Sequence, residues 1–195
     1  MKIYDISQKI FSCAIFPGDP APSKTVLNRL EDGDVCNLSA FSMCSHNGTH
    51  VDAPLHFIKD GKAIDEISTK TFVGYAYVAH HNGAVTKEDA ENILSSARTV
   101  NANERILIGG KATVSEEAAR VFASAGVLLV GNESQTVGPE NAPKAVHEIL
   151  LGANTVLLEG IRLCNVPQGK YILCAAPLNL EGLEGSPCRA ILIDF

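Results

Sequence analysis

The chain has 195 residues, of which 46% are hydrophobic, and this length and composition predict one domain with its own apolar core over residues 1–195. The net charge is −6 and no run of basic residues occurs, which argues against nucleic acid and membrane surfaces as partners. Because no apolar stretch approaches membrane-spanning length, we expect a cytoplasmic protein that acts on a small molecule.

The six cysteines form no Cys-x-x-Cys pair, which argues against a disulfide framework. Three of them, Cys44, Cys174 and Cys188, fall in apolar, strand-like runs. We therefore expect reduced, buried cysteines that pack as small apolar residues.

The first part of the chain contains two segments with strand character. Residues 2–7 alternate apolar and polar side chains and predict a first strand, and residues 16–20, Phe-Pro-Gly-Asp-Pro, have the composition of a turn. Residues 38–46 alternate again, which predicts a strand that delivers His46 at its end. A ligand at a strand end is held more firmly than one on a free loop.

Three of the six histidines and one aspartate lie between residues 46 and 56. His46 and His50 are close enough to converge on one ion, either across a helical turn or through a tight turn at Gly48. Asp52 follows, and its two carboxylate oxygens could each hold an ion, as in two-metal hydrolytic sites. Imidazole and carboxylate groups are ligands for divalent first-row metals, so this segment predicts a metal site.

His56 lies at the far end of this segment, beyond Pro54, which restricts any helix there to a short or distorted one. As a residue that does not bind the metal, His56 could titrate near neutrality and move protons beside a metal-bound water. A lone His-x-x-x-His pair is often structural. Three histidines and an aspartate in one short segment favour the metal site.

The middle of the chain alternates between strands and helices. Strands are predicted over 72–79, 105–109 and 127–131, and helices over 86–98 and 115–126. This rhythm predicts an α/β fold with a mixed, partly parallel sheet covered by helices. The neighbouring His80 and His81 would point to opposite faces of a strand, so we interpret them as structural or solvent-exposed.

A third helix is predicted with Asn141 as its N-cap and an end before Gly152. On it, His147 shares a face with two leucines and points inward, which by itself favours an ordinary core histidine. The next strand ends in Glu159, at the carboxyl end where α/β sheets gather their ligands, although an acid there could also face water. Residues 171–177 and 188–194 predict the last two strands, and Arg189 is interpreted as a paired structural cation.

The segment 46–57, HNGTHVDAPLHF, resembles the signature of the cyclase and kynurenine formamidase (arylformamidase) family of metal-dependent hydrolases, His-x-Gly-Thr-His-x-Asp-Ala-Pro-x-His. Further similarity runs along residues 4–20, 146–159 and 176–193, the last resembling the family's closing hairpin. The resemblance implies the family's cyclase-like swivelling β/β/α fold. It also implies a homo-oligomer, either a dimer or a tetramer.

The resemblance further assigns roles to individual residues. It implies a first ion held by His46, His50 and Asp52, and a second held by Asp52, His147 and Glu159. The ions would be zinc, one or two per subunit, although the same ligands accept manganese. It places Phe16 at the substrate pocket.

The activity that the resemblance implies is the hydrolysis of a small-molecule amide, most simply N-formylkynurenine to kynurenine and formate. A bound metal can lower the pKa of water from about 15.7 to about 7, so that hydroxide is available to attack the carbonyl. In this scheme His56 passes a proton to the departing amine.

Two departures from the family pattern leave alternatives open. Residues 131–138 lack the Gly-x-Asp, Ser and Asp that are common in the family, and Gly160 replaces the usual Asn after the glutamate. Both changes weaken the substrate prediction more than the metal prediction. The alternatives are a hydrolase of a cyclic amide, as in the isatin-hydrolase branch, a metal-bearing binding protein without turnover, and a zinc site that only braces the fold.

Overall fold

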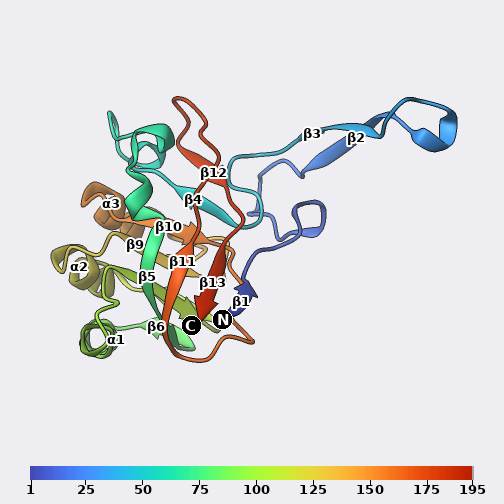
Figure 1. Cartoon of the computed structure of the whole chain (residues 1–195). Coiled ribbons are helices and arrows are strands. Elements are labelled where there is room, and N and C mark those ends of the chain that lie inside the picture. Colours follow the sequence, from blue (N-terminus) through green and yellow to red (C-terminus); the bar gives the residue numbers. More distant parts are fainter. Residues whose placement is uncertain (195) are drawn as a thin grey trace.

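Nine strands form one mixed sheet in the computed structural model, which describes residues 1–194 (Figure 1). The four central strands are parallel to one another, and the strands on both sides of them are antiparallel to their neighbours. In sheet order the strands are β1 (Lys2–Asp5), β13 (Ile191–Asp194), β11 (Gly169–Cys174), β5 (Val73–His80), β7 (Arg105–Gly109), β9 (Leu129–Asn132), β10 (Val156–Glu159), β4 (His50–Asp52) and β12 (Gly185–Pro187). The predicted α/β class with a partly parallel sheet is confirmed.

The sheet curls so that its two edges approach each other. Strands β12 and β13 stand near opposite ends of the strand order, yet only residues 188–190 separate them in the sequence. The backbone N–H of Cys188 donates to the carbonyl of Thr49 beside β4, while that of Ile6 after β1 donates to Ala190. The same short stretch of backbone therefore ties both edges together.

Three α-helices lie together on one side of the sheet (Figure 1). They are α1 (Lys87–Thr99), α2 (Glu116–Ser124) and α3 (Lys144–Gly152). Thr86 caps α1 by accepting a hydrogen bond from the backbone of Asp89, whose carboxylate bonds back to the Thr86 N–H, and Ser115 caps α2. None of the helices in residues 1–194 is long and apolar enough to cross a membrane.

The start of α3 differs from the prediction. Its N-cap is Pro143, whereas Asn141 lies in a turn closed by a hydrogen bond from the Ala142 N–H to the Pro139 carbonyl. A proline lacks the N–H that would otherwise need a partner at the helix start. The helix therefore begins directly after Pro143, with His147 on its buried face.

Apolar side chains fill both faces of the sheet. The helix-facing core includes Phe122, Ile106 and Leu150, and the opposite core includes Phe72, Val51 and Leu158. Strands buried on both faces carry nearly continuous apolar runs, as the central strands do here. The metal-ligand candidates sit at the edge of this core.

One strand prediction was wrong. The strand predicted over 38–46 ends at Ser42 as β3 (Leu38–Ser42), because the side chain of Asn47 accepts from the Cys44 N–H and folds the next residues into a turn. His46 therefore lies in a turn. The last two strands do form as antiparallel neighbours, but their connection contains β12, which pairs with β4 rather than completing a simple hairpin.

Two small sheets complete the fold. Strands β6 (Gly83–Val85) and β8 (Ala112–Val114) pair in parallel. Strand β2 (Ser23–Asn28), which the sequence did not predict, pairs with β3 in an antiparallel ribbon that projects away from the body of the protein (Figure 1). We call residues 23–42 the arm.

The cysteines are less buried than predicted. Cys36 and Cys164 are exposed, and the other four are partly buried; all six are free thiols within residues 1–194. Cys36 lies on the arm, where no core exists to cover it.

Candidate metal centre

Strand β4 and its neighbour β10 bring three of the candidate ligands together. His50 and Asp52 are two residues apart on β4, so their side chains point to the same side. The antiparallel register sets Glu159, at the end of β10, opposite His50. His147 reaches the same place from α3, and His46 reaches it from the turn that precedes β4.

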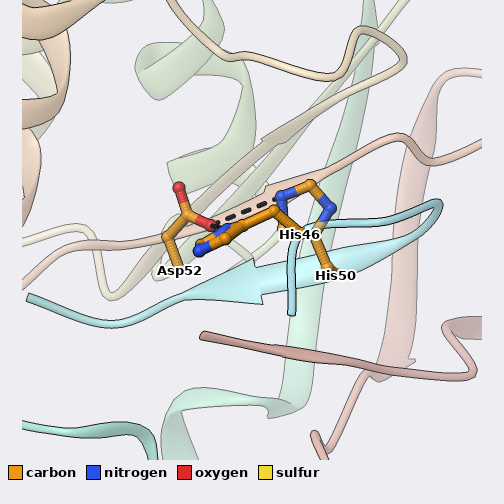
Figure 2. Close-up of side chains that lie close together, drawn as sticks. All are labelled: His46, His50 and Asp52. Atoms are coloured by element: carbon orange, nitrogen blue, oxygen red, sulfur yellow. Dashed lines mark hydrogen bonds and ion pairs between the residues drawn. The ribbon is translucent and has the colours of Figure 1, made fainter. Parts of the chain in front are cut away.

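His46, His50 and Asp52 form the first of two clusters, which we call the first triad (Figure 2). The Nδ1 atom of His46 lies 2.8 Å from Oδ1 of Asp52, and Nε2 of His50 lies 3.4 Å from the same oxygen. One ligand atom from each residue lies within 4.8 Å of the other two, so one ion could contact all three.

Asp52, His147 and Glu159 form the second cluster, which we call the second triad. Nε2 of His147 lies 3.2 Å from Oε1 of Glu159 and 3.6 Å from Oδ2 of Asp52. Asp52 thus presents Oδ1 to one triad and Oδ2 to the other. The structure brings together all five residues that the sequence suggested as ligands.

The donor atoms of these triads fit a divalent cation. Nε2 of His50 and Oδ2 of Asp52 are buried and have no hydrogen-bond partner within residues 1–194. A buried polar atom left unpaired costs about 1–3 kcal/mol, so such atoms in a native protein need an explanation. A cation held between imidazole nitrogens and carboxylate oxygens would provide the missing partner for both.

Backbone carbonyls orient two of the histidines. Nδ1 of His50 lies 3.0 Å from the carbonyl of Gly48, and Nδ1 of His147 lies 2.8 Å from that of Pro143. A proton on each Nδ1 leaves the Nε2 lone pair free to bind metal. Gly48 itself has φ +69°, and a Cβ there would press on the side chain of Cys13, which explains the glycine.

The electrostatics of the metal-free cluster favour positive imidazoles. Burial lowers the pKa of His50 and His147, but the nearby carboxylates of Asp52 and Glu159 outweigh it and raise the pKa to about 10 and about 9. Contacts with His46 and His50 hold the pKa of Asp52 well below its usual range, against the opposing effect of burial. Metal must therefore displace protons from these imidazoles when it binds.

His56 stands beside the triads without belonging to either. It ends the 3₁₀ helix Pro54–His56, its ring stacks on that of His46 at 4.0 Å between centroids, and its Nε2 lies 4.0 Å from Oδ2 of Asp52. Burial lowers its pKa; the Asp52 carboxylate opposes this effect, and charge repulsion from His46 and His147 adds to it. The lowered pKa favours the neutral imidazole, which can accept a proton.

Phe16 lies on the loop between the first 3₁₀ helix, Ile10–Ser12, and β2, where it is partly buried. Its carbonyl accepts a hydrogen bond from the Asp19 N–H, which closes the predicted turn, and the Asp19 carboxylate faces the thiol of Cys44. The loop therefore contacts the segment that leads to His46. A contact between Phe16 and substrate stays a prediction.

The residues that depart from the family pattern support the centre. Gln135 donates to the carbonyl of Gly48 and accepts from Gln8, which also donates to the carbonyl of Gly160. Gly160 has φ +69°, and a Cβ there would overlap the Gly48 carbonyl. The glutamines thus occupy the space that a side chain at position 160 would need, and they tie the first triad to β10.

Two acidic contacts were missed by sequence reasoning. Oε1 of Glu159 accepts a hydrogen bond of 2.7 Å from the backbone N–H of Val137, so the altered segment 131–138 also holds the second triad. Glu184 lies 3.1 Å from Nε2 of His46. The sequence signal that could have pointed to Glu184 is its position directly before Gly-Ser-Pro, within the segment 176–193 that resembles the family.

Three other charged or titratable residues lie apart from the triads. Arg189 pairs with Asp5, in agreement with its interpretation as a structural cation. His80 contacts the carbonyl of Val166, and His81 that of Ala84. These contacts agree with structural roles for both histidines.

The comparisons with known proteins identify the family. Residues 4–139 match the family model described as "Putative cyclase". The chain belongs to the cyclase family. It is 33% identical to the kynurenine formamidase of Salinibacter ruber over 208 aligned positions, covering 100% of this chain and 98% of that protein.

Solved structures agree with this assignment. A potential metal-dependent hydrolase with cyclase activity superposes with a TM-score of 0.80 at 28% identity, covering 98% of this chain and 96% of that one. Isatin hydrolase A from Labrenzia aggregata gives a TM-score of 0.82 at 22% identity, covering 98% and 93%, and shares the fold. Together with the two triads, these similarities indicate a hydrolase with a site for divalent metal.

Proposed function

We propose that this cyclase-family protein hydrolyses the amide of an N-formyl aryl amine, as in the conversion of N-formylkynurenine to kynurenine and formate. The observation that carries the proposal is the pair of triads that share Asp52, with two buried ligand atoms that have no hydrogen-bond partner among residues 1–194. The full-length similarity to kynurenine formamidases supports the substrate class.

The triads suggest that each chain binds two ions. We expect zinc in both positions, with manganese as the alternative metal. His46, His50 and Asp52 would hold one, and Asp52, His147 and Glu159 the other. Such an ion, when bound, lowers the pKa of water towards neutrality and polarises a carbonyl oxygen. The protein contributes the ligand geometry, because the backbone carbonyls behind His50 and His147 hold both rings in place.

His56 supplies the proton transfers in this proposal. Its neutral imidazole lies beside Asp52 and is 28% exposed, so it can reach both a water molecule and a bound substrate. It accepts a proton from the attacking water as the new C–O bond forms. It then gives that proton to the aryl nitrogen as the C–N bond breaks, which releases formate and the free amine.

The test is a substrate panel with protein reloaded with zinc or with manganese. We expect stoichiometric formate and aryl amine from N-formylkynurenine, measured by chromatography. Faster hydrolysis of isatin would replace the proposal with cyclic-amide hydrolysis. No turnover of any substrate, with both ions bound, would make the protein a metal-bearing binding protein.

We propose in addition that the arm packs against a second copy of this chain. All residues from 23 to 42 except Asn28 are exposed, including Leu27 at 55%, Phe41 at 63% and Val35 at 99%. An isolated two-stranded ribbon is at best marginally stable in water, and apolar residues on both of its faces need cover.

The size of the arm suits a homodimer. A standard interface takes about 20–30 residues from each partner, which is comparable to the arm's own length. The chain also offers a receiving surface, a cavity of about 780 Å³ at the base of the arm. Its lining includes the apolar residues Phe11, Phe41, Met43 and Leu178 and the charged residues Asp5, Lys9 and Arg189. In a dimer with two-fold symmetry, each copy would supply an arm and a cavity that receives the partner's arm.

Light scattering on the purified protein tests this partner. We expect a dimer for the unaltered chain and for the control Val100→Ser, which removes an exposed apolar residue at the end of α1. The double variant Leu27→Ser/Phe41→Ser should dissociate to monomers. A monomeric unaltered chain, or a double variant that stays dimeric, would overturn the proposal.

A further inference from the structure

Glu184 is an acidic residue outside both triads whose carboxylate contacts one of the candidate ligands. It directly precedes β12, and its backbone carbonyl accepts from the Ala53 N–H, which places it against the signature segment. Its Oε1 atom lies 3.1 Å from Nε2 of His46 and accepts a hydrogen bond of 2.5 Å from the hydroxyl of Ser45. The serine thus aims the carboxylate at the imidazole.

Each histidine of the triads has an outer nitrogen, the ring nitrogen that points away from the triad: Nδ1 in His50 and His147, and Nε2 in His46. The three differ in what contacts this atom. Backbone carbonyls accept from His50 and His147, whereas a carboxylate side chain stands behind His46. The inner nitrogen of His46 is Nδ1, which lies 2.8 Å from Asp52, so its two ring nitrogens face two different acids. A proton on Nε2, shared with Glu184, would leave the Nδ1 lone pair for the first triad.

We infer that Glu184 is a positioning residue for metal binding, which selects the tautomer and orientation of His46; this inference rests on the proposed metal site. A carboxylate behind a metal-binding histidine also makes the imidazole a stronger donor. The other two histidines, with neutral carbonyls behind them, lack this increase.

The packing around His46 restricts the orientation of its ring. The ring of His56 stacks on one face at 28° between the planes. On another side lies Gly185, where a Cβ would come within 2.7 Å of Cε1 of His46. Because position 185 has no side chain, the ring can lie close to the backbone, with its outer nitrogen directed at Glu184.

We expect Glu184 to contribute little to folding stability, so that substituting it tests metal binding without unfolding the chain. Its side chain is 36% exposed, and a partly exposed ion pair contributes little to folding. A change in metal affinity without a change in the melting temperature of the metal-free protein would therefore report positioning.

The experiment measures zinc affinity of the metal-free full chain by competition with a chromophoric chelator. Loss of a residue behind a metal-binding histidine typically weakens metal affinity about 10–100-fold. In Glu184→Ala we expect this loss for one of the two ions, the one that His46 would bind. Glu184→Gln keeps an acceptor oxygen and should recover most of the affinity. Ser45→Ala should produce a smaller loss in the same direction.

The control is Glu181→Gln, which removes an equal charge from an exposed position on the same loop and should leave affinity unchanged. With cobalt in place of zinc, Glu184→Ala should also alter the visible absorption of the bound ion, because the ligand field at His46 changes. Melting curves of each metal-free variant check that the chain is folded.

The outcomes separate this inference from the proposed function. An unaltered chain that binds no zinc would contradict the metal site itself. An unaltered chain that binds zinc while Glu184→Ala binds it equally well, with the same cobalt spectrum, would overturn the inference. Loss of one ion in both Glu184→Ala and Glu184→Gln would also overturn it, since Glu184 would then be a ligand.

Discussion

The two triads that share Asp52 are assembled in different ways. The first triad comes from one short segment, in which a turn at residues 44–47 and the strand β4 bring His46 and His50 to the aspartate. The second triad needs His147 from α3 and Glu159 from β10. Local sequence spacing can therefore predict the first triad, whereas the second exists only once the sheet has formed.

The residues found in only one triad also differ in burial. His147 and Glu159 have side chains that are only 3% exposed, while His46 is 14% exposed and contacts the partly exposed Glu184. Within the first triad, His46 therefore depends on a surface side chain for its orientation, whereas His50 and Asp52 are buried. The second depends on the core and on the backbone of the segment 131–138, through the Val137 N–H.

The largest loss of metal is expected for Asp52→Asn, because a neutral amide cannot bridge two cations. Elemental analysis after reloading and dialysis should find both ions lost, and hydrolysis should fall to background. Asp60→Asn, at an exposed aspartate of the following turn, should keep both. Two bound ions in Asp52→Asn would mean that the triads do not share this residue.

Single-ligand variants compare the triads directly. His46→Ala should lose the first ion and keep the second, while His147→Ala should do the reverse, since each histidine belongs to one triad only. Elemental analysis with calorimetric titration would give one ion per chain for each variant. If either variant lost both ions, the triads would be one cooperative unit.

A smaller effect is expected for Gln135→Ala, which removes the bond to the Gly48 carbonyl behind His50. Affinity for the first ion should weaken about tenfold, and the free energy of unfolding should fall by about 1 kcal/mol. Chelator competition and urea denaturation would measure the two effects. Gln168→Ala, which loses a hydrogen bond to Tyr77, a residue of neither triad, should weaken folding only.

His56→Ala should leave both ions in place, because His56 belongs to neither triad. Turnover should nevertheless fall by about 10²–10⁴-fold, the usual contribution of a general acid or base. Steady-state kinetics on the metal-loaded variant would measure this. Unchanged turnover would remove His56 from the proton transfers.

The sequence predicted the residues that meet at the centre better than the backbone that brings them there. His46, His50 and Asp52 could be grouped from spacing, and the central β-α-β rhythm gave the parallel strands. The strand expected to deliver His46 was wrong because the side chain of Asn47 closes a turn, a local bond that alternation of apolar residues does not reveal.

Other features lacked a local signal altogether. Glu184 meets His46 only because β12 pairs with β4, a contact between distant parts of the chain. Strand β2 was missed because its residues, Ser-Lys-Thr-Val-Leu-Asn, show no alternation of apolar and polar side chains. Without the resemblance, His147 would have been assigned to the core, and Glu159 would have stayed open between a ligand and an acid that faces water.

Anomalous diffraction at the zinc edge, from crystals of the reloaded protein, tests the central claim most directly. We expect two peaks on either side of the Asp52 carboxylate, one about 2.0–2.2 Å from Nδ1 of His46 and Nε2 of His50, the other equally close to Nε2 of His147. Zinc bound elsewhere, or no peak between these residues, would contradict the shared metal centre.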